Sequence, residues 1–124
     1  MEFTLEFNLA VSDLERAKTW YSEILGLKPI NPDDEELIYS AGGTHFCIYE
    51  SENAGTNKAT AARFIVKDFD AVRADLLAKG IVFEEYDLGD DFRTVEGVLT
   101  SPDGERTSWF KDSEGNILAL GSSR

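Results

Sequence analysis

The sequence predicts one α+β domain built from two tandem βαβββ modules: residues 1–50, a connector at 51–60, and residues 61–124. Three observations lead to this fold class: an internal repeat, strand-like alternation and helix-like spacing of apolar residues. The segment from Val11, V-S-D-L-E-R-A-K-T-W-Y-S-E-I-L-G-L, matches the segment from Val66, V-K-D-F-D-A-V-R-A-D-L-L-A-K-G-I, in its order of features. Each has an apolar strand end, an acidic helix start, an amphipathic helix and a terminating glycine.

Each module opens with a strand that has one apolar face, because apolar and polar residues alternate with a period of two. In module one the apolar face consists of Phe3, Leu5, Phe7, Leu9 and Val11, and the other face of Thr4, Glu6, Asn8 and Ala10. In module two the corresponding apolar residues are Ala62, Phe64 and Val66, and the other face holds Ala61, Arg63 and Ile65. We expect the first set of each strand to be buried under the helix of its own module.

The helix that follows each strand has recognisable ends. Ser12 followed by Glu15 is a capping-box pattern, and Gly26 supplies a left-handed C-cap. The second helix is expected to start near Asp68 and to end at Gly80. The apolar stripes expected to pack on the sheets are Leu14, Ala17, Tyr21, Ile24 and Leu25 in the first helix, and Phe69, Val72, Leu76 and Leu77 in the second.

Short apolar runs separated by turn residues predict the remaining strands. In module one they are residues 27–30, 37–40 and 45–50. In module two they are residues 81–86, 94–99 (or part of it), 107–111 and 116–120. The polar stretch S-E-N-A-G-T-N-K-A-T at 51–60 reads as the connector.

The net charge and the cysteine content restrict the possible binding partners and the cellular compartment. The 24 acidic residues against 12 basic ones give a net charge of −12. This opposes binding to nucleic acid and to anionic membranes, and favours either a cationic ligand or simple solubility. Cys47 is the only cysteine, and there is neither a signal-peptide pattern nor a membrane-length apolar run. We therefore expect a cytoplasmic protein.

Two segments carry a resemblance to a known superfamily. The stretch from Val11 to Leu27, and W-F-K-D-S-E-G-N-I-L-A-L at Trp109 to Leu120, resemble the glyoxalase/bleomycin-resistance/dioxygenase proteins, also called the vicinal oxygen chelate superfamily. The resemblance covers essentially the whole chain. It implies two modules that form a cupped mixed sheet, and a homodimer.

The same resemblance implies where a metal would be bound. The four ligand positions of the superfamily's enzymes fall on Glu6, Ala61, Ala119 and either Cys47 or Ile48. Alanine has no lone pair to donate, and metal sites need about three protein ligands. We therefore expect no metal and no other cofactor, as in the metal-free, bleomycin-binding branch related to antibiotic resistance.

These observations predict metal-independent binding of a small molecule, planar or cationic, with no catalytic residue assigned. Whether the protein is an enzyme stays open. The alternative is a divalent-metal-dependent lyase or isomerase resembling lactoylglutathione lyase, or a dioxygenase, whose displaced metal site would need Glu6, His45 or Cys47, and Glu50. A further alternative is an interaction module with a vestigial cleft. No phosphate loop, CxxC, HExxH or GxSxG motif is present.

Residues on the polar strand faces and on a long connection are the candidate ligand-binding groups. They are Glu6, Asn8, His45, Arg63, Phe92, Trp109, Ile117 and Ala119. If the first strands of the two modules pair, as the resemblance implies, we expect one shared cavity lined by Glu6, Asn8, Arg63, Ile65, Ile117 and Ala119. Three alternatives remain: Glu6 pairs with Arg63, His45 makes a structural hydrogen bond, and Cys47 is an inert buried residue. Trp109 and its neighbour Phe110 point to opposite faces, so one of them is expected in the core.

Overall fold

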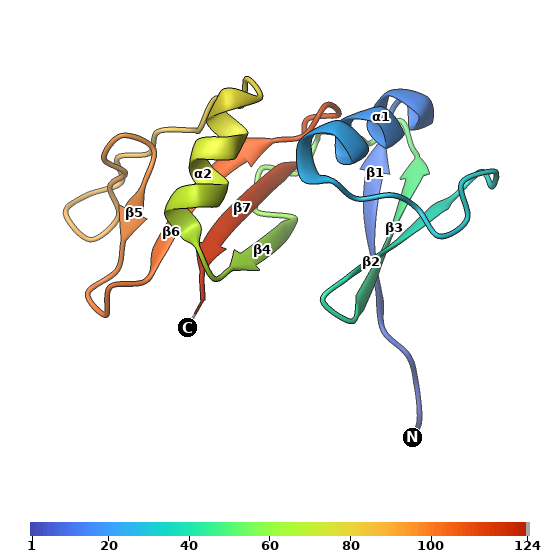
Figure 1. Cartoon of the computed structure of the whole chain (residues 1–124), viewed down its shortest axis with the longest axis horizontal. Helices are drawn as coiled ribbons and strands as arrows, with labels where there is room; N and C mark the ends of the chain where they lie inside the picture. Colours follow the sequence, from blue (N-terminus) through green and yellow to red (C-terminus); the bar gives the residue numbers. More distant parts are fainter. Residues whose placement is uncertain (124) are drawn as a thin grey trace. The chain divides into compact units, whose positions relative to one another are not determined.

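The computed structural model describes residues 1–123, which form two helices and seven strands (Figure 1). The chain divides into two compact units, each with its own sheet and its own helix. Unit 1 contains residues 1–58 and the turn 112–116, and unit 2 contains residues 59–111 and the segment from Ile117 onward. The α+β class is confirmed.

Unit 1 consists of β1 (Glu6–Val11), α1 (Leu14–Leu25), β2 (Leu37–Ala41) and β3 (Thr44–Glu50). The strand order is β1-β3-β2, with β1 parallel and β2 antiparallel to β3. Helix α1 packs on one sheet face through Tyr21, whose ring centroid lies 5.7 Å from that of Tyr39 and 5.9 Å from that of Phe46. The core of unit 1 therefore lies between α1 and this face.

Unit 2 consists of β4 (Ala62–Val66), α2 (Phe69–Ala78), β5 (Leu99–Thr100), β6 (Arg106–Lys111) and β7 (Ile117–Ser122). The order is β4-β7-β6-β5, with only the β4–β7 pair parallel among these strands. Helix α2 is tied to β6 by Arg106, whose guanidinium lies 4.7 Å from the ring centroid of Phe69 and donates to Asp70 Oδ1 at 2.7 Å. Phe110, Leu118 and Leu120, at most 2% exposed, form the core on the same sheet face.

The turn between β6 and β7 belongs to the core of unit 1. The hydroxyl of Tyr21 donates to Asp112 Oδ2 at 2.7 Å, and Asn116 Nδ2 donates to the carbonyl of Ala10 at 2.9 Å. Glu114 accepts from the backbone N–H groups of Ser12 and Asp13, at 3.0 and 2.9 Å. These bonds anchor the start of α1, where orphan N–H groups and the helix dipole favour a carboxylate.

The Glu114 carboxylate is strongly stabilised in its charged form. Burial alone would raise its pKa, but hydrogen bonds from Arg16, Ser113 and the start of α1 outweigh burial and lower the pKa from 4.5 to about 2. The side chain is 0% exposed, and Arg16 Nε donates to it at 2.8 Å. Because the folded-state pKa lies below the unfolded one, the carboxylate stabilises the fold above about pH 4.5 and loses that effect as pH falls toward 2.

Several expected elements differ in the structure. The N-cap of α1 is Asp13, whose side chain accepts from the N–H of Arg16, and not Ser12. Residues 27–30 and 81–86 are not strands, and of residues 94–99 only Leu99 lies in one. Unit 1 is therefore βαββ and lacks the first expected strand after its helix, whereas unit 2 is βαβββ.

The set of buried residues also differs from the expectation, both in the first strand and in α2. Phe3, Leu5 and Phe7 are 76%, 63% and 53% exposed. Phe3 and Leu5 precede the part of β1 that pairs with β3, which begins at Glu6, whereas Phe7 is exposed although it pairs with Phe46. Leu77, expected in the stripe of α2, is 46% exposed, whereas Leu76 is 1% exposed. The predicted caps at Gly26, with φ of 67°, and at Asp68 are confirmed.

Candidate functional site

Each sheet has one face that is not covered by its helix, and we call it the open face of that unit. In unit 1 the register pairs Glu6 with His45 and Asn8 with Cys47. Cross-strand partners share a face, and alternate residues on one strand do too. Since Phe46 lies on the α1 face, the candidates Glu6, Asn8 and His45 share the open face, and all three are exposed.

In unit 2 one row of three residues crosses the open face. Arg63 on β4 pairs with Ala119 on β7, and Ala119 pairs with Trp109 on β6. Ile117 precedes Ala119 by two positions and therefore lies on the same face. Phe110 lies on the α2 face against Phe83, so the expected opposition of Trp109 and Phe110 holds.

The open face of unit 2 carries three rings in mutual contact, which we call the aromatic cluster: Tyr86, Phe92 and Trp109. The ring centroid of Trp109 lies 5.5 Å from that of Tyr86 and 5.6 Å from that of Phe92. All three residues are half-buried, and Trp109 Nε1 donates to Thr60 Oγ1 at 3.0 Å. The indole is therefore oriented while part of each ring stays accessible. Sequence reasoning singled out Phe92 and Trp109 but missed Tyr86.

The partner of Arg63 is Glu105, whose carboxylate accepts from Arg63 Nη2. Arg63 and Glu105 side chains are 28% and 18% exposed. Glu105 lies just before β6, which pairs with β7 next to β4, and no local sequence pattern marks it as a partner of Arg63.

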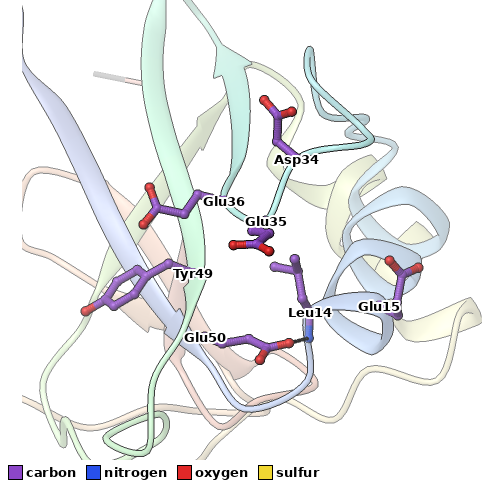
Figure 2. A pocket seen from close by; sticks show the side chains of 7 residues that line it. All are labelled: Leu14, Glu15, Asp34, Glu35, Glu36, Tyr49 and Glu50. Atoms are coloured by element: carbon purple, nitrogen blue, oxygen red, sulfur yellow. Dashed lines mark hydrogen bonds between the residues drawn. The ribbon is translucent and has the colours of Figure 1, made fainter.

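Unit 1 also contains a pocket of about 570 Å³ at the end of its sheet (Figure 2). Its lining is acidic apart from two residues: Leu14, Glu15, Asp34, Glu35, Glu36, Tyr49 and Glu50. The N–H of Leu14 donates to Glu50 Oε1 at 3.3 Å. The run D-D-E-E at 33–36 was the sequence signal for this pocket, but sequence reasoning assigned no function to it.

Cys47 lies on the open face of unit 1 but is only 3% exposed. Burial, followed by the nearby carboxylates of Glu36 and Glu6, raises the pKa of its thiol. The S–H group donates to the carbonyl of Ile48 at 3.6 Å. The protonated thiol is therefore favoured, which makes Cys47 a poor nucleophile.

Comparison with known proteins identifies the family. The model of the Glyoxalase/Bleomycin resistance protein/Dioxygenase superfamily matches residues 5–120. The chain belongs to this superfamily. No protein with a curated description is significantly similar to it in sequence.

Solved structures of the superfamily share the fold over the full chain. A glyoxalase/bleomycin resistance protein from Catenulispora acidiphila is 27% identical, with a TM-score of 0.68, and the match covers 99% of this chain and 100% of that one. A lactoylglutathione lyase from Agrobacterium tumefaciens is 16% identical, with a TM-score of 0.72 and coverage of 99% and 95%. A superfamily member from Sphaerobacter thermophilus is 20% identical, with a TM-score of 0.69 and coverage of 99% and 98%.

The residues present do not fit the metal that enzymes of the superfamily bind. Of the positions implied by the resemblance, Ala61 and Ala119 offer no donor atom, and Ile48 lies on the α1 face, 0% exposed, so only Glu6 and Cys47 remain. The alternative, displaced metal site of Glu6, His45 or Cys47, and Glu50 does not fit either. Glu50 lies on the α1 side of the sheet, where its carboxylate accepts from the N–H of Leu14, whereas the other three residues lie on the open face. Within residues 1–123, no three His, Cys, Asp or Glu side chains are grouped so that they could hold a metal ion.

In the part of the chain that the structure describes, neither helix has the length and apolar character needed to span a bilayer.

Proposed function

We propose that the protein binds a small planar molecule on the open face of unit 2, without a metal ion and without breaking a bond. The observation that carries this proposal is the aromatic cluster beside Ala119. Half-buried rings whose orientation is fixed by neighbours offer a preformed stacking surface. Trp109 is held by its hydrogen bond to Thr60 and by ring contacts with Tyr86 and Phe92.

The small side chain at the centre of the row supports the same proposal. Ala119 stands where the superfamily resemblance implies a metal ligand, between Arg63 and Trp109. The methyl group of Ala119 is only 1% exposed and offers no atom for metal coordination. Recognition there would therefore rest on stacking, on hydrogen bonds and on the charge of neighbouring groups, and not on a metal.

The net charge of −12 led to the sequence-based expectation of a cationic ligand, and the exposed carboxylate of Glu6 and the acidic pocket of unit 1 have the same sign as this net charge. The strands of the open face of unit 2 carry cations instead, namely Arg63 and Lys111. The proposed stacking on Trp109 does not depend on the charge of the ligand, so ring and charge can be tested separately.

The test is ligand-induced thermal stabilisation with a panel of naphthalene derivatives that carry a carboxylate, a carboxamide or a methylammonium group. Saturation at about 100 times the Kd adds about 3 kcal/mol of stability, or roughly 10 °C in Tm. We expect wild-type protein and a Trp20→Leu control to be stabilised by at least one compound, and Trp109→Leu not to respond. An unchanged shift in Trp109→Leu, or no shift with any compound, would contradict the proposal.

A further inference from the structure

Arg63 occupies a place on the open face of unit 2 that a glycine keeps free. A Cβ added at Gly121 would lie 2.5 Å from Arg63 Nε and 2.6 Å from Nη2. The guanidinium therefore lies across β7 in the space that a side chain at residue 121 would fill. Gly121 is needed here for room, since any larger residue displaces the guanidinium.

The guanidinium is held but has hydrogen-bonding capacity left. Nη2 donates to Glu105, whereas the buried Nε has no partner among residues 1–123. Arginine has five N–H donors in a planar fork that matches a carboxylate. A buried donor without a partner is costly, and an acceptor that reached it would recover that cost. The side chain is 28% exposed, so part of it is open to solvent.

The charges on this face run against those of the whole protein. Its strand positions contain two cations and no carboxylate: Arg63, Ile65, Leu99, Thr107, Trp109, Lys111, Ile117, Ala119 and Gly121. Each cation has one carboxylate partner next to the sheet, Glu105 for Arg63 and, at 3.8 Å, Glu84 for Lys111. The local pairs are balanced, so the net charge of −12 does not by itself determine which charge this face prefers.

We infer that the planar ligand is an aromatic carboxylate, whose ring stacks on Trp109 and whose carboxylate accepts hydrogen bonds from Arg63. Arg63 and Trp109 are separated by two strand spacings, roughly 10 Å, with Ala119 between them. A bicyclic aromatic acid can span this row with its ring at one end and its carboxylate at the other. The inference rests on the proposed function and specifies its ligand class.

The experiment is calorimetric titration of the intact chain with 2-naphthoate, 2-naphthamide and 2-naphthylmethylammonium. We expect wild-type protein to bind 2-naphthoate at least tenfold more tightly than the ammonium compound, with the amide between them. Arg63→Gln and Gly121→Ala should each weaken 2-naphthoate binding tenfold or more, the first by removing the charge and the second by displacing it. Lys67→Gln, an exposed cation elsewhere in unit 2, is the matched control and should bind like wild type.

The outcomes separate this inference from the proposed function. If 2-naphthoate binding depends on Trp109 but is unchanged in Gly121→Ala and Arg63→Gln, or if the amide or the ammonium compound binds as tightly, the carboxylate inference is wrong and the stacking site stands. If no compound shows Trp109-dependent binding, the proposed function fails and the inference fails with it. Should Arg63→Gln not fold, as judged by circular dichroism, Gly121→Ala decides, because it keeps every charge.

Discussion

Replacing Tyr21 by phenylalanine tests whether the turn 112–116 is an integral part of the core of unit 1. The Tyr21 hydroxyl donates to Asp112 Oδ2 at 2.7 Å, and the two residues are 0% and 6% exposed. Burial, reinforced by the neighbouring carboxylate of Asp112, raises the pKa of Tyr21, so the hydroxyl keeps its proton and acts as a donor. Asp112 also accepts from the N–H groups of Glu114 and Asn116, at 2.8 and 2.9 Å.

The expected loss follows from the kind of bond that is removed. A hydrogen bond to a charged acceptor contributes about 1.5–3 kcal/mol, and Tyr21→Phe leaves a buried carboxylate with one donor fewer. We therefore expect the free energy of unfolding to fall by about 1.5–3 kcal/mol. The ring itself stays, so its contacts with Tyr39 and Phe46 are kept.

Tyr39 provides a matched control in the same core. Tyr39 is 0% exposed and stacks on Phe46 at 5.0 Å, but its hydroxyl has no partner in the part of the chain that the structure describes. Tyr39→Phe should therefore cost less than about 0.5 kcal/mol or stabilise the protein. Urea unfolding followed by circular dichroism at pH 7 measures both variants. Equal losses, or a loss below about 0.5 kcal/mol in Tyr21→Phe, would refute this reasoning.

Three other predictions follow from the structure. Glu114→Gln should lower the free energy of unfolding by up to about 3 kcal/mol at pH 7, as a pKa shift from 4.5 to about 2 implies. In the same urea assay this loss should shrink as pH falls below 4.5, because the wild-type carboxylate then loses its charge. The exposed Glu52→Gln serves as the control. Leu76→Ala should cost about 2–5 kcal/mol and Leu77→Ala under about 1 kcal/mol, since Leu76 is 1% and Leu77 46% exposed; similar losses would show that the helix is wrongly placed. Elemental analysis of purified protein should find no stoichiometric divalent metal. About one ion per chain, lost in Glu6→Ala, would contradict the conclusion that the residues present do not fit a metal site.

Local patterns in the sequence predicted the elements whose cause is local. Gly26 and Asp68 cap helices through bonds within a few residues, and alternation placed Trp109 and Phe110 on opposite faces. Ser12 was misassigned as a cap because its N–H and hydroxyl bind Glu114, which is 102 residues away in the sequence.

The strands that failed to form show the same limit. Apolar runs at 27–30 and 81–86 are typical of strands, yet Ile30 donates to Ile38 and Glu84 to Trp109 as single backbone bonds outside any regular ladder. Whether an apolar run forms a strand depends on a distant edge that can pair with it. The sequence of the run alone does not contain that information.

For the candidate site, period-two alternation placed Arg63, Ile117 and Ala119 on one face, and the register agrees. Tyr86 and Glu105 were missed because they enter this face from segments that precede β5 and β6, and their place depends on how the chain turns back onto the sheet. Their positions follow from tertiary structure and not from spacing along the sequence.

The proposed binding face is tested most directly by nuclear magnetic resonance of ¹⁵N-labelled protein titrated with 2-naphthoate. The chain has two tryptophans, so two indole N–H signals report separately on Trp20 and Trp109. We predict a large shift of the Trp109 indole signal, accompanied by the backbone signals of Arg63 and Ala119, while the Trp20 signal stays in place. Shifts concentrated at Asp34 to Glu36 or at Trp20, with Trp109 unchanged, would contradict this prediction.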